Sequence, residues 1–325
     1  MIDRNMNPDF LNSFLDYSIT ILNKSPNSIK EYNYDIANFL KFIKIQYRLT
    51  DEKDYSKIPI NDIDIDLMRK ITLEDIHRYI SYMATELKSK PSTRARKVSS
   101  LRIFFKYLTV KTKDLDVNPA QNLETPKLGK RIPKYLSLDE SKQLLETVKN
   151  DDNRNSSRDY AIITLFLNCG VRLSELVNIN INDISFSECK LNVIGKGNKE
   201  RTIYLNNSCM SAINSYLLDR PKDIKEIDSK NALFLSERRE RISNRTVQSI
   251  VKKELQKTGL DVNKYSVHKL RHTAATLMYQ YGNVDIRALQ ELLGHESIST
   301  TEIYTHVDNS QVRSAVENNP LANFK

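Results

Sequence analysis

The sequence predicts a mainly α-helical protein of two domains, with a small β-sheet or hairpin in the second. Three observations predict this fold class. Apolar residues recur at helical spacing along most of the chain. The alternation of apolar and polar residues that is typical of strands occurs at 190–194 and 201–205. Three of the nine prolines fall within residues 119–133, among basic residues, where an extended linker would divide a chain of 325 residues into two domains.

The first domain is expected at residues 1–117 and is predicted to consist of helices. A helix is predicted over 27–46, because its apolar residues share one face. A second helix over 72–87 has Thr72 as its expected N-cap, and Asp75 three residues later makes a loose capping box. The acidic segment 51–66 contains Pro59 and is expected to be a surface loop.

The net charge of +9 comes from one segment of this domain. Between residues 88 and 113 there are nine basic residues and no acidic one. Apolar residues at helical spacing predict a buried stripe here, and basic residues lie on another face. Such a helix suits the phosphates of nucleic acid, and a solvated surface helix is the alternative. The residues predicted to contact DNA are Arg94, Arg96, Lys97, Arg102 and Lys106, together with Lys130 and Arg131.

The second domain is expected at residues 136–325, after a basic linker at 118–135. Helices are predicted over 139–149 and 158–168, with Gly170 ending the second of these, and over 246–257, 268–281, 285–293 and 300–306. The two alternating segments bracket a Gly-Lys-Gly-Asn sequence and predict a β-hairpin with Lys196 at its tip.

Composition and motifs argue against several classes of protein. The seven glycines match neither GxGxxG nor GxxxxGK, so we expect no nucleotide-driven chemistry and no cofactor. The three cysteines form no CxxC pair, which argues against a disulfide framework and a thiolate zinc site. The apolar runs are too short for a membrane span and the N-terminus lacks a signal-peptide pattern, so a cytoplasmic protein is expected.

Candidate reactive residues gather in the second domain. Four of the five histidines lie between residues 268 and 306, and His268 shares a helical face with Arg271. Arg172 stands at the entrance of a helix. His268 and His272 have metal-ligand spacing, but residue 269 is lysine where a zinc protease has glutamate, so no metal is predicted. Taken singly, each of these residues is more often a surface or packing residue.

Together, the motifs resemble the tyrosine recombinase family, and most of all its Xer branch. The matching segments are Cys169-Gly170-Val171-Arg172-Leu173-Ser174-Glu175-Leu176, Gly195-Lys196-Gly197-Asn198-Lys199-Glu200-Arg201, His268-Lys269-Leu270-Arg271-His272, and Leu293-Gly294-His295 leading to Tyr304. Segments 25–42 and 92–108 are similar to the family's core-binding helices. The resemblance implies a two-domain DNA clamp, in which a SAM-like core-binding domain precedes a catalytic domain with a C-terminal tail.

The resemblance also implies a role for each residue of the motifs. Tyr304 would be the nucleophile, leaving a 3′-phosphotyrosyl strand. Arg172 and Arg271 would clamp the phosphate oxygens, His268 and His295 would assist with protons and hydrogen bonds, and Lys196 would protonate the 5′-oxygen. Glu175 would support the active site.

The expected function is site-specific DNA recombination through a Holliday junction, with Xer-like resolution of chromosome dimers favoured. The resemblance implies a tetramer on double-stranded DNA, formed with itself or with a paralogous recombinase, near the nucleoid. It also implies a tail that docks in trans, and it leaves room for an accessory activator. The alternatives are the integrase of a phage or transposon, a type IB topoisomerase-like enzyme and a non-catalytic DNA-binding regulator.

Overall fold

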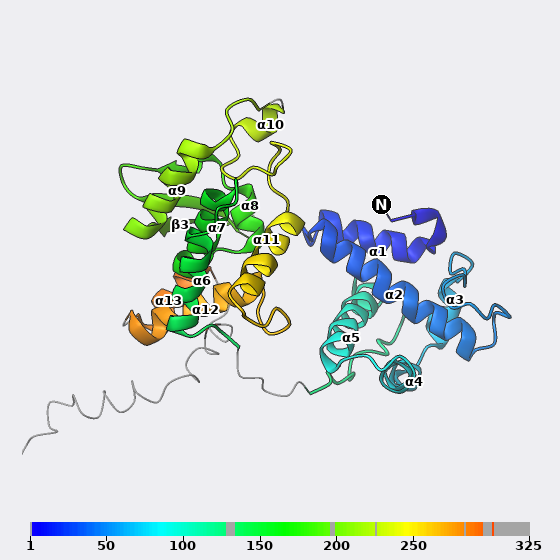
Figure 1. Ribbon diagram of the computed structural model, residues 1–325. Coiled ribbons are helices and arrows are strands. Elements are labelled where there is room, and N and C mark those ends of the chain that lie inside the picture. The colour runs from blue at the N-terminus through cyan, green and yellow to red at the C-terminus, as the bar shows by residue number, and fades with distance from the viewer. Residues whose placement is uncertain are drawn as a thin grey trace, which may run out of the picture. The chain divides into compact units, whose positions relative to one another are not determined.

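The computed structural model describes residues 2–127, 134–195, 199–224, 226–282, 284–294 and 301 (Figure 1). The chain divides into two compact units, Met1–Lys130 and Arg131–Lys325, and each is considered by itself. The described residues are mainly helical with one small antiparallel sheet, which confirms the predicted fold class. None of the helices in these ranges is long and apolar enough to cross a membrane.

The first unit consists of helices. They are η1 (Arg4–Met6), α1 (Asp9–Thr20), α2 (Pro26–Gln46), α3 (Ile65–Lys70), α4 (Leu73–Thr85), α5 (Pro91–Lys106) and the π-helical turn η2 (Tyr107–Lys111). The helices predicted over 27–46 and 72–87 are confirmed as α2 and α4. Thr72 and Asp75 make the expected capping box in both directions. The predicted surface loop is irregular as far as Asp64, but its last two residues begin α3.

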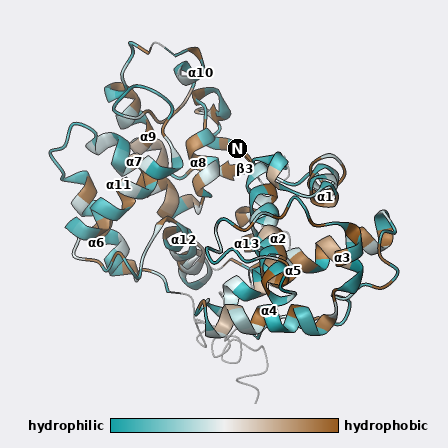
Figure 2. Cartoon of the chain, turned by 90° about the vertical axis from the view of Figure 1, so that its right-hand side faces the viewer, coloured by the Kyte–Doolittle hydropathy of each residue, from teal (hydrophilic) through white to brown (hydrophobic). Residues whose placement is uncertain are grey.

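Helices α1, α2, α4 and α5 enclose the core of the first unit. The predicted apolar stripe of α5 is confirmed, because Val98, Leu101 and Phe105 have no exposed surface. Aromatic rings fill the space between helices, as where Phe14 meets Phe104 edge-on with ring centroids 5.3 Å apart. Figure 2 shows brown hydrophobic and teal hydrophilic residues on the same helices, as the amphipathic pattern predicts.

The second unit surrounds one central helix. Its elements are α6 (Leu138–Lys149), α7 (Ser156–Cys169), α8 (Leu173–Asn178), η3 (Ile181–Asp183), β1 (Ile184–Ser185), β2 (Lys190–Ile194), β3 (Glu200–Tyr204), α9 (Asn207–Asp219), α10 (Ile227–Lys230), α11 (Asn244–Lys257), α12 (Val267–Tyr281) and α13 (Ile286–Leu293). Helix α7 lies among the other helices of this unit (Figure 1) and contacts α6, α9, α11 and α12. Most of its residues are buried.

The sheet of the second unit has the order β1-β2-β3, and both pairs are antiparallel. The predicted hairpin is confirmed as β2 and β3, in which Val193 pairs with Arg201. Strand β1 was not predicted. Helices α8, α12 and α13 begin within one or two residues of their expected positions, and they bring together the ends that carry the candidate residues.

Candidate active site

Arg172 and Glu175 form a pair at the start of α8. Arg172 is the N-cap residue of the helix, with an extended backbone. Its backbone N–H donates to Glu175 Oε2 at 2.8 Å, and its Nη1 donates to Glu175 Oε1 at 2.7 Å. A carboxylate at the third helical position satisfies a donor that the helix leaves unpaired and fixes the arginine beside it.

Glu175 is held as a buried carboxylate. Burial alone would raise its pKa, but hydrogen bonds from Arg201 and Arg172 hold the pKa below the usual range of glutamate. The group is therefore negatively charged at neutral pH and supplies a fixed charge to the site. From the sequence we expected Glu175 to support the active site beside Arg172. The structure brings the two residues together.

Arg271 joins the ends of two other helices. It projects from α12 and is buried, and its Nη1 donates to the carbonyl of Gly170 at the end of α7. Its Nη2 donates to the carbonyl of Leu293 at 2.6 Å. Gly170 has φ +59°, and an added Cβ would come within 3.1 Å of the Leu293 side chain. A glycine at this position therefore lets α7 end against α13.

His268 lies one turn before Arg271 on α12, as the sequence predicts. Burial lowers its pKa, and the positive charges of Lys269 and Arg271 lower it further. Its ring stacks edge-on against His272 with centroids 4.5 Å apart. An imidazole of this kind is uncharged near neutral pH and able to accept a proton.

A cavity of about 800 Å³ brings these residues to one surface. Arg172 lines it from the start of α8, and His268 and Arg271 line it from α12. Helix α11 supplies the opposite part of the lining, including Gln248 and Lys252. Two guanidinium groups and one imidazole in a single cavity suit a negatively charged ester such as a phosphodiester.

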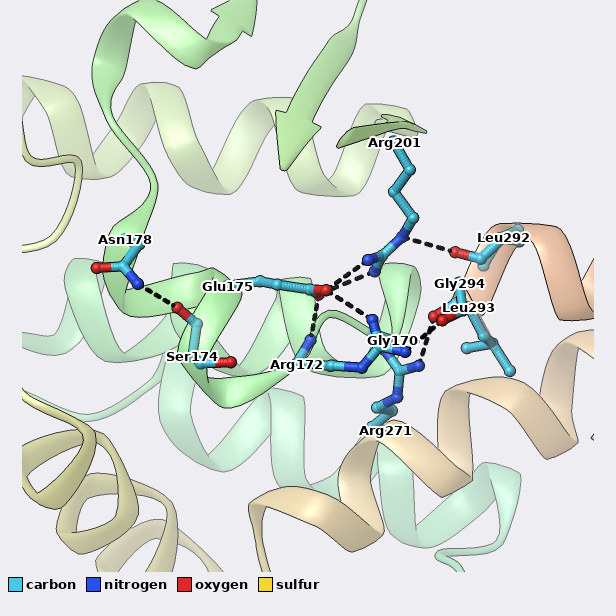
Figure 3. Close-up of polar contacts among 10 residues, drawn as sticks. All are labelled: Gly170, Arg172, Ser174, Glu175, Asn178, Arg201, Arg271, Leu292, Leu293 and Gly294. Carbon is cyan, nitrogen blue, oxygen red and sulfur yellow. Dashed lines mark hydrogen bonds and ion pairs between the residues drawn. The ribbon is translucent and has the colours of Figure 1, made fainter. Parts of the chain in front are cut away.

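Arg201 also contacts Glu175, and the sequence analysis assigned no role to it. Its Nη1 and Nη2 both donate to Glu175, and its Nε donates to the carbonyl of Leu292 at 3.2 Å (Figure 3). One signal was present in the sequence. Arg201 shares a face of β3 with buried Ile203, and a charged residue at such a position needs a buried partner.

Three arginines converge on the C-terminal end of α13. Arg201 binds the carbonyl of Leu292, Arg271 that of Leu293, and Arg172 that of Gly294 at 2.5 Å. The last carbonyls of a helix lack intrahelical partners and carry partial negative charge, so cations stabilise them. Gly294 has φ +62°, and an added Cβ would meet Arg201 Cδ at 3.2 Å and Arg172 Nη1 at 3.4 Å. This position therefore requires glycine.

Several predicted site residues lie outside the described part of the chain. They are Lys196, His295, Tyr304, Lys130 and Arg131. The residues directly before Lys196 and His295 in the chain are among the described residues. Gly195 and Lys199 lie on the two sides of the hairpin loop, and the backbone N–H of Gly195 donates to the carbonyl of Lys199 at 2.7 Å. Gly294 directly precedes His295.

The predicted DNA-contacting residues of α5 fall into two groups. Arg96 pairs with Glu31 and with the buried carboxylate of Asp35, and Lys97 is itself buried with its Nζ 3.1 Å from Asp35. Both cations join α5 to α2, and the side chain of Lys97 is 10% exposed whereas that of Arg96 is 40% exposed. Arg94 and Arg102 are half-buried. Arg94 donates to the carbonyl of Ser89, just before α5, and Arg102 donates to the carbonyl of Leu123 and to Thr125 Oγ1, whereas Lys106 is exposed.

Two family models together match most of the chain. The model described as the phage integrase family matches residues 134–311. The model described as the phage integrase N-terminal SAM-like domain matches residues 10–113. The first match includes every motif of the second unit.

Full-length relatives and solved structures agree with these matches. The chain is 55% identical over 316 residues to the tyrosine recombinase XerC of Caldanaerobacter subterraneus subsp. tengcongensis, covering 97% of this chain and 88% of the relative. It is 34% identical to the XerC of Thermodesulfovibrio yellowstonii, covering 92% of each. Its fold is similar to that of the XerH recombinase bound to palindromic difH DNA, with TM-score 0.72 and 21% identity over 95% of this chain and 83% of the other. It is also similar to the Tn1549 transposon integrase bound to transposon right-end DNA, with TM-score 0.69 and 19% identity over 94% and 98%.

Proposed function

Because the chain belongs to the tyrosine recombinase family, in its Xer branch, we propose that it cuts and rejoins two copies of a specific DNA site through a 3′-phosphotyrosyl intermediate. It is a tyrosine-type site-specific recombinase, and DNA is its substrate. The observation that carries the proposed chemistry is the convergence of Arg172, Arg271 and His268 on one cavity.

The proposed reaction begins with attack by a tyrosine, and the new covalent bond conserves the energy of the phosphodiester. Tyr304 attacks the scissile phosphorus, a 3′-phosphotyrosyl bond forms and the 5′-oxygen leaves, so resealing needs no nucleotide. A phenol has a pKa of about 10, and attack near neutral pH is assisted by a base. His268 suits that role because its lowered pKa keeps it uncharged. Lys196 would protonate the leaving 5′-oxygen, and His295 would assist at the phosphate.

Arg172 and Arg271 are proposed to stabilise the transition state. Negative charge gathers on the non-bridging oxygens of the phosphorus, and guanidinium groups bind such oxygens through paired hydrogen bonds. Both groups are already oriented by carbonyls of the protein, so little reorganisation accompanies binding. Preorganised donors of this kind typically contribute about 3 kcal/mol each. Glu175 would hold Arg172 in place.

The proposed assembly is a tetramer on DNA, in which pairs of protomers exchange strands in sequence through a Holliday junction. The basic residues Arg94, Arg96, Arg102 and Lys106, with Lys130 and Arg131, would contact phosphates. The tail that follows Tyr304 would dock on a neighbouring protomer and couple cleavage to assembly. Resolution of chromosome dimers in the cytoplasm, at the nucleoid, is the proposed biological role.

An integrase of a phage or transposon is not favoured. The relatives that cover nearly the whole chain at 55% and 34% identity are XerC recombinases, whereas the likeness to a transposon integrase is 19% identical and shows the fold alone. A DNA-binding regulator without activity is not favoured either, because Arg172, His268 and Arg271 are all present in one site.

The test is strand exchange by purified protein. The DNA site is first selected by wild-type protein from a random duplex library, and two copies are then placed as direct repeats on one supercoiled plasmid. We expect two smaller circles to appear without ATP or a metal ion. Relaxation of plasmid that lacks the site would instead indicate a topoisomerase, and binding without any strand cleavage would indicate a regulator.

A further inference from the structure

One buried carboxylate holds two guanidinium groups in the second unit (Figure 3). Glu175 Oε1 accepts hydrogen bonds from Arg172 and Arg201, and Oε2 accepts from Arg201 at 2.9 Å. The side chain of Glu175 is 1% exposed, that of Arg201 is 14% exposed and that of Arg172 is 28% exposed. The cluster therefore contains two positive charges and one negative charge, and Arg172 is the more exposed cation.

Arg172 and Arg201 differ in whether they line the cavity. Arg172 lines the cavity that would receive the scissile phosphate, and Arg201 is not among the lining residues. A carboxylate in direct contact with Arg172 opposes the attraction between that arginine and a phosphate, and the effect is large where water is excluded. Arg201 supplies two of the four hydrogen bonds that Glu175 accepts. Its charge thus offsets that of Glu175 although Arg201 does not line the cavity.

Arg201 also connects the hairpin to the last turn of α13. Its backbone belongs to β3, which pairs with β2 across the loop that contains Lys196. Its Nε binds the carbonyl of Leu292, two residues before the carbonyl that Arg172 binds. A single side chain therefore links β3, α8 and the end of α13.

We infer, on the basis of the proposed function, that Arg201 is a positioning residue for strand cleavage. By pairing with Glu175 it leaves the positive charge of Arg172 directed at the scissile phosphate. By binding Leu292 it fixes the chain three residues before His295. Arg201 touches neither the DNA nor the reacting atoms in this arrangement, and it acts through Glu175, Arg172 and Leu292.

We expect E175Q to have opposite effects on the cleavage rate in the wild type and in R201M. In R201M the carboxylate of Glu175 has Arg172 as its one remaining arginine partner, so the phosphate experiences a nearly neutral pair and cleavage slows by about tenfold or more. In the wild type, E175Q loosens Arg172 and slows cleavage. In R201M the same change removes the carboxylate that neutralises Arg172, so E175Q/R201M cleaves several-fold faster than R201M.

The measurement is the single-turnover rate of covalent complex formation, with full-length protein in excess over a nicked duplex that carries the selected site. R201K is expected to recover part of the rate, because it restores the charge but not the paired hydrogen bonds. R220M is the matched control. Arg220 also holds backbone carbonyls in the second unit, those of Ala232 and Leu233, but it does not touch the cluster. R220M should lower the thermal midpoint and leave the cleavage rate of the folded protein unchanged.

Two outcomes would overturn the inference while leaving the proposed function intact. One is wild-type cleavage by R201M. The other is a rate loss from E175Q that is as large in R201M as in the wild type, which would indicate a role in stability alone. Absence of a covalent complex from wild-type protein would instead remove the proposed function itself, and the inference with it.

Discussion

Arg172 and Arg271 are oriented before any substrate is present. Each of the two side chains donates to a carbonyl at the end of α13, and Arg172 also donates to Glu175. A guanidinium has five N–H donors in a rigid plane, so these bonds fix the direction of the whole group. Such fixed dipoles and charges stabilise a transition state without reorganisation. The site is therefore built at the residue scale from arginines that bind backbone.

The pH dependence of cleavage belongs to this scale. Burial lowers the pKa of His268, so the neutral base persists below the usual histidine pKa of about 6.5. We expect the single-turnover rate to fall in acid with a midpoint below the ordinary histidine pKa of about 6.5. H268Q should be slower and should lose this fall. A fall centred above pH 6.5 in the wild type, absent from H268Q, would contradict the proposed environment of His268.

At the scale of elements, some cations of α5 pair with α2 and others are more exposed. Asp35 of α2 is buried and accepts from Arg96, Lys97 and Ser100, so these residues join two helices of the first unit. Arg102 and Lys106 occupy later turns of α5 and are more accessible than Lys97. The cationic segment therefore combines a structural ion cluster with an exposed surface.

Loss of the buried carboxylate should destabilise the first unit. D35A leaves the buried ammonium of Lys97 without its carboxylate partner, and breaking a buried pair in this way costs about 3–5 kcal/mol. We expect a marked decrease in the thermal midpoint, measured by circular dichroism. The control E31A removes an exposed partner of Arg96 and should cost less than about 1 kcal/mol. Equal effects of D35A and E31A would show that the buried cluster contributes little.

Exposed cations on the same helix should act on DNA binding instead. If Lys106 contacts a phosphate, K106A should weaken binding to any duplex and reduce the slope of log affinity against log salt by about 0.9. The measurement is a titration by fluorescence anisotropy at several salt concentrations. K24A, a change of a cation outside α5, should leave the slope unchanged. A wild-type slope in K106A would show that this part of α5 does not face the DNA backbone.

Local patterns were sufficient for most of the helices and for the hairpin. The stripe of Val98, Leu101 and Phe105 identifies α5 because its members are neighbours on one helix. Long-range ion pairs have no such signature. Asp35 and Arg96 are 61 residues apart, and Glu175 and Arg201 are 26 apart on different elements. Strand β1 has two residues, too few to show alternation. The resemblance therefore predicted Arg172, His268 and Arg271 as site residues, but it assigned no role to Arg201.

At the scale of the whole molecule, the proposed function couples cleavage to assembly. The sequence that follows His306 predicts a helix with an N-cap at Ser310, an apolar face and an end at Pro320. These residues lie outside the described ranges. In the proposed tetramer they tie one protomer to the next.

Truncation after Asn309 tests this coupling. The shortened protein should bind a half-site with wild-type affinity, because the arginine cluster and α5 are retained. Binding to the full site should lose cooperativity, and recombination should fall by at least about tenfold, as expected when about 1.4 kcal/mol of coupling is lost. Mobility-shift titrations of half and full sites report both quantities. Unchanged cooperativity together with full recombination would exclude the tail as the link between protomers.

The central claim is that Tyr304 forms a covalent bond to DNA. It is tested most directly with Y304F, full-length wild-type protein and a nicked duplex carrying the selected site, followed by denaturing electrophoresis. The phenyl ring lacks only the nucleophilic oxygen, so Y304F should bind the duplex with nearly wild-type affinity and form no covalent complex. The wild type should yield an adduct that protease converts to a peptide on the 3′-phosphate. A protein–DNA adduct that persists in Y304F would contradict the claim and place the nucleophile elsewhere.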